Sequence, residues 1–164
     1  MSRLSHLDSR DKVKMVDVAL KQPTVRCAVA ACEIHMKPET FALLEGGRLA
    51  KGDAFTVAKT AGILAVKRTA ELIPLCHPLP LEQIEIRFFN RPQHDGVFIE
   101  TEVHTTAKTG VEMEALTGVA IAALTLYDMA KSSDPGMVIG DLHLVKKSGG
   151  KSDYKYSSRN HHGE

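Results

Sequence analysis

Acidic side chains lie at both ends of an apolar stretch, Val111–Met129, that we expect to form a helix. Glu114 and Asp128 are separated by 14 positions in the chain. At about 100° and about 1.5 Å per residue, a helix places them on nearly the same face but roughly 21 Å apart. The two carboxylates therefore cannot act on one reacting atom of the same chain. Asp128 is a candidate for proton transfer, because a carboxylate among apolar neighbours tends to have a shifted pKa or a functional role.

Two features near these carboxylates also have purely structural interpretations. Lys131 lies three positions after Asp128, so the two side chains can meet near the end of the helix. A surface ion pair of this kind contributes less than about 1 kcal/mol and needs no function. Thr109 and Glu112 have the spacing of a capping box, in which Glu112 would satisfy a free backbone amide at the start of the helix.

A loop with three prolines, residues 74–80 (PLCHPLP), is a second candidate site. Proline fixes its own φ and restricts the residue before it, so Leu75, Cys76 and His77 would have little conformational freedom. His77 can bind by hydrogen bonds or transfer protons near neutral pH, or it can be a structural histidine. Cys76 is better explained as a small buried hydrophobic residue. We expect no metal site, because no second pair of ligands accompanies Cys76 and His77 at a metal-binding spacing.

Basic side chains recur where the expected elements end. Lys51 lies just before a helix that begins near Asp53, where free backbone amides favour an anion. Residues 149–152 (GGKS) resemble the end of a Walker A loop, but Val145 stands where that loop requires glycine, so we do not predict a P-loop. The other cations at element ends are Arg26, Lys67, Arg68, Lys131, Lys146, Lys147 and Lys151.

The elements that must position these residues follow from the alternation and length of the apolar runs. Asp53 is a good N-cap and Pro74 ends the segment, which predicts one long helix over 53–73. The expected strands are 24–36, 81–89, 97–106 and 137–147, and the expected helices are 38–45, 53–73 and 111–129. This β-α-β-β-α-β order predicts an α+β, ferredoxin-like sandwich, with an antiparallel sheet and two long helices on one face.

Composition and charge exclude several classes of partner. The 164 residues include 21 Lys and Arg against 20 Asp and Glu, a net charge of +1, so the chain lacks the basic excess of nucleic-acid binders. Neither a signal-peptide core nor a membrane-spanning apolar run is recognisable. Three cysteines without a CxxC pair favour reduced thiols and a cytoplasmic location. We expect one domain over residues 1–152, followed by a mobile tail over 153–164.

Several longer strings resemble one family closely. They are 51–53 (KGD), 72–79 (LIPLCHPL), 109–117 (TGVEMEALT), 126–129 (LYDM) with Lys131, and 147–152 (KSGGKS). These strings resemble the MoaC family of molybdenum cofactor biosynthesis, and the resemblance runs from about Leu4 to Ser152. It implies a lyase that converts (8S)-3′,8-cyclo-7,8-dihydroguanosine 5′-triphosphate into cyclic pyranopterin monophosphate and releases pyrophosphate.

The resemblance also implies roles for individual residues. Asp128 and Lys131 would be the acid–base pair, with Lys51 and His77 beside them. The implied substrate-binding residues are Leu75, Cys76, His77, Glu112, Met113, Glu114, Arg26, Lys67 and Lys147. The implied assembly is a homohexamer, a trimer of dimers, and the implied partner is the cyclised GTP intermediate, with no nucleic acid and no membrane. We expect no cofactor, and whether Mg²⁺ accompanies the triphosphate stays open.

Two alternative functions use the same features. A non-catalytic ferredoxin-like module that senses a nucleotide would explain the fold and the cations, but not the acidic, lysine and histidine residues in such specific strings. A cyclohydrolase-type ring opener would need a zinc-bound water, for which the sequence shows no ligands.

The gap between Glu114 and Asp128 leads to a further hypothesis. Two symmetry-related copies would place the start of one helix near the end of another, so that the site lies at a subunit boundary.

Overall fold

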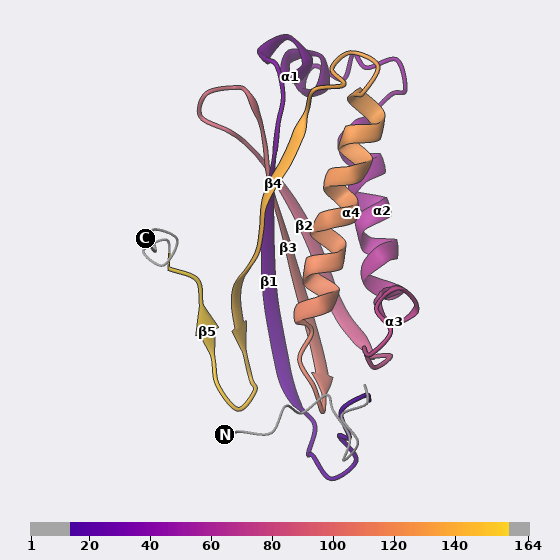
Figure 1. Cartoon of the computed structure of the whole chain (residues 1–164), viewed down its shortest axis with the longest axis vertical. Coiled ribbons are helices and arrows are strands. Elements are labelled where there is room, and N and C mark those ends of the chain that lie inside the picture. Colours follow the sequence, from indigo (N-terminus) through magenta and orange to yellow (C-terminus); the bar gives the residue numbers. More distant parts are fainter. Residues whose placement is uncertain (1–13, 158–164) are drawn as a thin grey trace.

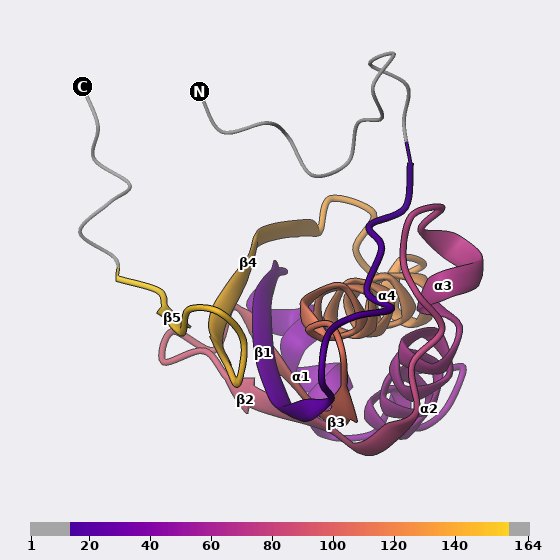
Figure 2. The ribbon, with the colours of Figure 1, turned by 90° about the horizontal axis from the view of Figure 1, so that it is seen from below.

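The computed structural model describes residues 14–157 of the chain. A five-stranded antiparallel sheet, in the order β2-β3-β1-β4-β5, forms one layer, and helices form the other (Figure 1). The strands are β1 Thr24–His35, β2 Leu81–Asn90, β3 Gly96–Ala107, β4 Val138–Ser148 and β5 Tyr154–Lys155; the helices are α1 Pro38–Glu45, α2 Ala54–Lys67, α3 Thr69–Leu72 and α4 Glu112–Ala130. Figure 2 shows α2 and α4 on the same side of the sheet. The predicted α+β, ferredoxin-like fold is confirmed.

β1 is the central strand and brings distant loops together. It pairs with β3 on one side and with β4 on the other, so that Thr24 lies opposite Ala107 and Cys27 lies opposite Ser148. Because both pairings are antiparallel, the start of β1 meets the ends of β3 and β4 at one end of the sheet. The segments that follow these two strands, 108–112 and 149–152, therefore lie at the same end of the molecule.

α2 and α4 pack closely because small residues line their contact. A Cβ on Gly62 of α2 would lie 2.9 Å from the carbonyl oxygen of Gly118 in α4, and one on Gly118 would lie 2.5 Å from Cγ2 of Val66. α4 is long and apolar enough to cross a membrane by length and composition alone, but half of that stretch is buried inside the fold. Val119 and Leu126 are fully buried, and α4 packs against both α2 and the sheet as a core helix.

The first long helix differs in part from the prediction. Asp53 is its N-cap as predicted, with Oδ1 accepting a hydrogen bond from the backbone N–H of Thr56 at 3.1 Å. The single helix expected over 53–73 is wrong. Arg68 leaves the helical conformation, at φ −110° and ψ 13°, and separates α2 from the short α3. The hydroxyl of Thr69 then donates back to carbonyl oxygens in the last turn of α2.

The segment expected to be a C-terminal tail includes a short strand. Tyr154 and Lys155 pair with Lys147 and Lys146 of β4 and form β5. The backbone N–H of Tyr156 continues this contact by donating to the carbonyl oxygen of Val145 at 2.7 Å. The rest of the expected tail, residues 158–164, lies outside the described residues.

Candidate active site

The C-terminal end of α4 carries a cluster of ion pairs. Asp128 accepts a hydrogen bond from Lys131 Nζ at 2.7 Å and another from Lys51 Nζ at 2.8 Å. Lys51 Nζ also donates to the backbone carbonyl oxygen of Asp128 at 2.8 Å. The contact between Asp128 and Lys131 follows from their helical spacing. The loop before α2 adds Lys51, which is 77 positions away from Asp128 in the chain.

These contacts determine the protonation state of Asp128. Hydrogen bonds from Lys131 and then from Lys51 lower the pKa of Asp128 to about 2, and Asp128 in turn raises the pKa of Lys131. Asp128 is therefore ionised at neutral pH, and Lys131 keeps its proton. The shifted pKa expected for Asp128 is present, but its cause is ion pairing and not an apolar environment, because 55% of the Asp128 side-chain surface is exposed.

A second region lies at the end of the sheet where β1, β3 and β4 meet. It is a cavity of about 410 Å³, which we call the cationic cavity. Its basic residues are Lys21, Arg26, Lys108, Lys147 and Lys151. Nε of Arg26 is buried and has no hydrogen-bond partner among the described residues. Several cations and an unpaired guanidinium N–H are suited to the oxygens of a polyanion such as a triphosphate.

Glycines allow the loop after β4 to close around this cavity. Gly149 has φ +84°, and a Cβ there would lie 1.8 Å from the carbonyl oxygen of Val25. A Cβ on Gly150 would lie 2.8 Å from Nη1 of Arg26. Position 149 therefore requires glycine, whereas a Cβ at position 150 would displace the end of the Arg26 side chain. The GGKS run is not a P-loop, but it lines a cavity with the character of an anion site.

Glu112 belongs to the cationic cavity and does not form a capping box. The N-cap of α4 is Val111, and no side chain caps the helix there. Glu112 Oε1 instead accepts a hydrogen bond from Lys147 Nζ at 2.9 Å. The capping interpretation is therefore wrong, because the helix begins with Glu112 itself, which points toward β4.

A third region adjoins the cationic cavity. It is a cavity of about 440 Å³, the loop cavity, whose walls include the proline-framed loop and the start of α4. From the predicted set it contains Leu75, Cys76, His77, Met113 and Glu114. It shares Lys21, Thr109, Gly110 and Glu112 with the cationic cavity. The two cavities are therefore adjacent and share part of one wall. A smaller cavity of about 140 Å³ continues from His77 and Glu114 to Lys67 and Arg68.

Glu114 is the buried ionisable group of the loop cavity. It is only 4% exposed, and this burial, with a smaller contribution from the charge of Glu112, raises the pKa of Glu114 to about 7. Burial and the charge of Glu114 also raise the pKa of the Cys76 thiol. A carboxyl group with this pKa is present in both its protonated and its ionised form near neutral pH, so it can donate a proton to a bound ligand or accept one from it.

We predict that Glu114→Gln removes a pH dependence of stability. The pKa of Glu114 is higher in the folded protein, about 7, than its ordinary value of 4.5. Its contribution to stability is therefore fully present below about pH 4.5 and is lost as the pH rises through about 7. Relative to Glu114→Gln, the wild type should lose on the order of 3 kcal/mol of unfolding free energy across that range.

Denaturant unfolding at a series of pH values measures this difference. Glu82→Gln is the matched control, because Glu82 is an exposed glutamate on β2 that lines none of the cavities described above. This control should keep the wild-type pH profile. Parallel profiles for wild type and Glu114→Gln would show that Glu114 is not titrating in the way described.

The described residues form two separate groups within one chain. Lys51, Asp128 and Lys131 lie at the end of α4, whereas His77 lies with Glu114 at its start. α4 is a continuous helix from Glu112 to Ala130, so the calculated gap of roughly 21 Å between its two carboxylates holds. His77 is therefore not beside the Asp128 cluster of its own chain.

Two of the basic residues that line the cavities, Lys21 and Lys108, were not among the cations singled out from the sequence. Lys21 lines both large cavities. Lys108 lines the cationic cavity, and its Nζ donates to the carbonyl oxygen of Ala19 at 2.8 Å, which ties the segment before β1 to the loop after β3. Lys108 directly precedes the TGVE string, and this position could have marked it as a cavity residue. Nothing in the sequence marks Lys21.

Comparisons with known proteins show the family of this chain. The family model described as the MoaC family matches residues 15–150. The chain belongs to the MoaC family. A relative from Thermomicrobium roseum named cyclic pyranopterin monophosphate synthase is 54% identical over 152 residues, which cover 93% of this chain and 92% of the relative. A relative of the same name from Pelotomaculum thermopropionicum is 55% identical and covers 93% of this chain and 89% of its own length. The predicted family is confirmed, and these MoaC relatives span nearly the whole chain.

Proposed function

We propose that this protein is a cyclic pyranopterin monophosphate synthase of molybdenum cofactor biosynthesis, a lyase. It converts (8S)-3′,8-cyclo-7,8-dihydroguanosine 5′-triphosphate into cyclic pyranopterin monophosphate and pyrophosphate. The observation that carries this proposal is the pair of cavities that share Lys21, Thr109, Gly110 and Glu112. One is cationic and the other combines apolar and ionisable groups, as a ligand with a triphosphate and a cyclised purine requires.

The cationic cavity receives the triphosphate. Arg26, Lys147 and Lys151 supply charge-assisted hydrogen bonds to its oxygens. Formation of the cyclic phosphate makes a bond from the α-phosphorus to a sugar oxygen and breaks the bond to the β-phosphate. The leaving pyrophosphate carries away negative charge, which the same cations stabilise as it develops.

The loop cavity receives the cyclised purine. Leu75 and Met113 supply apolar surface, while His77 and Glu114 offer hydrogen bonds to ring nitrogens and exchangeable protons. The group at the end of α4 consists of Asp128, Lys51 and Lys131, and the carboxylate of Asp128 lies between the two ammonium groups. It carries out acid–base steps on the same ligand, where a fixed carboxylate and a protonated lysine complement each other.

We propose that the two groups meet in a homohexamer, a trimer of dimers. One chain supplies the start of α4 and a second chain supplies the end of α4, which resolves the gap of roughly 21 Å. The exposed apolar side chains Val57 and Leu64 of α2 and Leu124 of α4 are available to such interfaces. We place the reaction in the cytoplasm and assign no resident cofactor. Mg²⁺ bound to the triphosphate is compatible with the proposal.

The test is incubation of the purified protein with the cyclised GTP intermediate. The proposal predicts equal amounts of pyrophosphate and of a pterin that becomes fluorescent on oxidation. Binding of the intermediate without pyrophosphate release would instead support a nucleotide-sensing module. A ring-opened product that keeps its triphosphate would support cyclohydrolase chemistry.

A further inference from the structure

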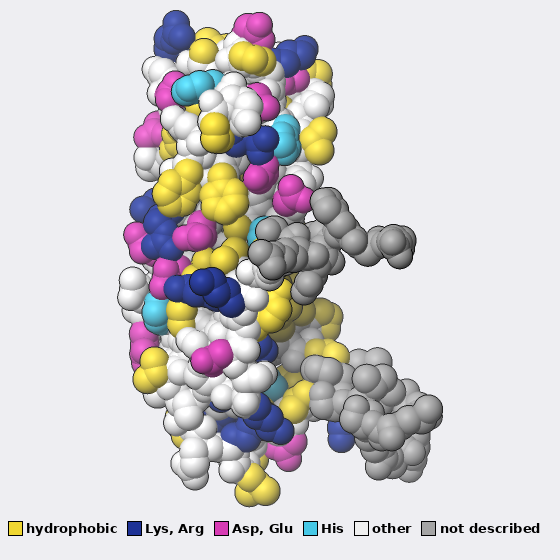
Figure 3. Space-filling view, turned by 90° about the vertical axis from the view of Figure 1, so that its left-hand side faces the viewer, with side chains coloured by type: hydrophobic (Ala, Val, Ile, Leu, Met, Phe, Trp, Pro, Cys, Tyr) yellow, Lys and Arg dark blue, Asp and Glu magenta, His cyan; other side chains and the backbone are white. Residues whose placement is uncertain are grey.

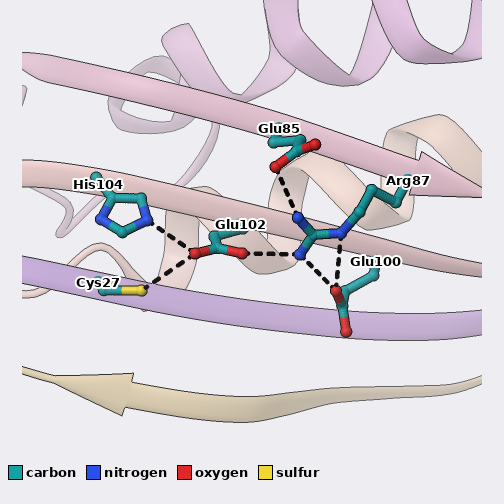
Figure 4. Close-up of polar contacts among 6 residues, drawn as sticks. All are labelled: Cys27, Glu85, Arg87, Glu100, Glu102 and His104. Atoms are coloured by element: carbon teal, nitrogen blue, oxygen red, sulfur yellow. Dashed lines mark hydrogen bonds and ion pairs between the residues drawn. The ribbon is translucent and has the colours of Figure 1, made fainter.

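A cluster of polar side chains lies on the face of the sheet that the helices do not cover. Figure 3 shows this side of the molecule, where acidic, basic and apolar side chains are interleaved. On β1 and β3 alternate residues such as Ala28, Ala30, Val97 and Val103 enter the core between sheet and helices. The residues between them point the other way. Cys27, Glu102 and His104 belong to this second set, and Figure 4 shows them close together.

The three side chains converge on one point. Cys27 of β1 is directly opposite His104 of β3 in the strand register, and Glu102 is two positions before His104 on the same face. Glu102 Oε1 lies 2.8 Å from His104 Nε2 and 3.9 Å from Cys27 Sγ. One ligand atom from each residue lies within 4.8 Å of the other two. All three side chains are partly buried, so the sheet holds them in place.

A second layer of contacts fixes the carboxylate of this cluster. Glu102 Oε2 accepts a hydrogen bond from Arg87 Nη2 at 2.7 Å, and Arg87 is held in turn by Glu100 and Glu85 (Figure 4). These contacts leave Oε1 as the oxygen that faces Cys27 and His104. Metal-binding carboxylates commonly have their other oxygen hydrogen-bonded in this way.

The chemical types of these three side chains indicate which metal ion they would bind. A thiolate, an imidazole and a carboxylate together suit Zn²⁺, whereas Ca²⁺ and Mg²⁺ prefer oxygen ligands alone. Charge also favours a cation, since Glu85, Glu100 and Glu102 outnumber Arg87 and the nearby Lys146. We propose that Cys27, Glu102 and His104 bind one Zn²⁺ ion. A zinc–sulfur bond forms at Cys27, the thiol proton leaves to solvent, and water completes the tetrahedral coordination.

This site is separate from the proposed reaction and borders it. Cys27 also lines the cationic cavity, so a bound ion lies beside the wall of that cavity. The spacing of Cys27, Glu102 and His104 along the chain matches no metal-binding motif. Strand pairing alone brings them together, which is why the sequence predicts no metal site.

Titration with Co²⁺, a spectroscopic substitute for Zn²⁺, tests the proposal on the whole, assembled protein. His161 and His162 lie outside the described residues, so both are changed to Gln in every sample to remove them as competing ligands. We expect one Co²⁺ per chain, a thiolate-to-cobalt charge-transfer band, and displacement of the ion by stoichiometric Zn²⁺. Cys27→Ser should abolish the band, and His104→Gln should weaken binding at least about tenfold.

Cys76→Ser is the matched control, because Cys76 is a partly buried thiol next to a histidine but lies in the loop cavity. It should keep the charge-transfer band. The proposal is overturned if the band survives in Cys27→Ser, if it disappears in Cys76→Ser, or if stoichiometric Co²⁺ gives no band. Should Cys27→Ser fail to fold, unchanged Co²⁺ affinity in folded His104→Gln would overturn it equally.

Discussion

Asp128→Asn is expected to reduce product formation by about 10²–10⁴-fold while nucleotide still binds. Asparagine keeps the shape of the side chain but cannot be ionised. It can neither accept a proton nor hold Lys51 and Lys131 by charge, as Asp128 does at 2.8 Å and 2.7 Å. If the cluster acts only in the transition state, kcat and kcat/KM should fall together. Pyrophosphate release gives both constants, and calorimetry gives the affinity for the nucleotide.

An acid-to-amide change at an exposed carboxylate elsewhere distinguishes a loss of catalytic chemistry from a mere change in net charge. Glu82→Gln removes one negative charge from β2 and lies outside both residue groups, so its rate should match the wild type. A kcat within about twofold of wild type for folded Asp128→Asn would make the cluster a surface ion pair. Loss of nucleotide binding in proportion to the loss of rate would assign Asp128 to ground-state binding instead.

The fold could be predicted because its signals are local. Alternation of apolar and polar residues marks β2 and β3, and the Asp53 cap marks the start of α2. The break at Arg68 could not be predicted, because neither proline nor glycine marks it. The hydroxyl of Thr69 bonds to carbonyl oxygens three and four positions before it, which a threonine within a continuous helix also does, so this residue gives no signal of the break.

The candidate site was predictable only where its residues are close in sequence. The helical spacing of Asp128 and Lys131 gives their contact directly. Lys51 reaches Asp128 across 77 positions, and no spacing rule covers such a distance. Glu112 illustrates the opposite error. Its local pattern indicated a cap, but the charge of Lys147 on β4 binds it more effectively. Contacts between segments far apart in the chain decide both cases.

Asp128→Ala and Glu114→Ala chains, each inactive alone, are expected to recover pyrophosphate release when they are mixed. Asp128 and Glu114 lie at opposite ends of α4, roughly 21 Å apart, so one ligand cannot contact both in a single chain. If each site takes the Asp128 group from one chain and the Glu114 group from another, Asp128→Ala and Glu114→Ala damage different halves. Chains that exchange freely then assemble some sites in which both halves are intact.

Mixing Asp128→Ala with Glu114→Ala chains therefore tests most directly whether the active site is built from two subunits. Equal amounts with random exchange should restore about a quarter of wild-type pyrophosphate release, since each half is intact with a chance of about one half. Asp128→Ala mixed with Lys51→Ala is the matched control, because both changes lie in the same half, and it should stay inactive. Native mass spectrometry confirms that subunits have exchanged. Recovery to about a quarter in the first mixture alone is the predicted result, and no recovery after confirmed exchange would contradict a shared site.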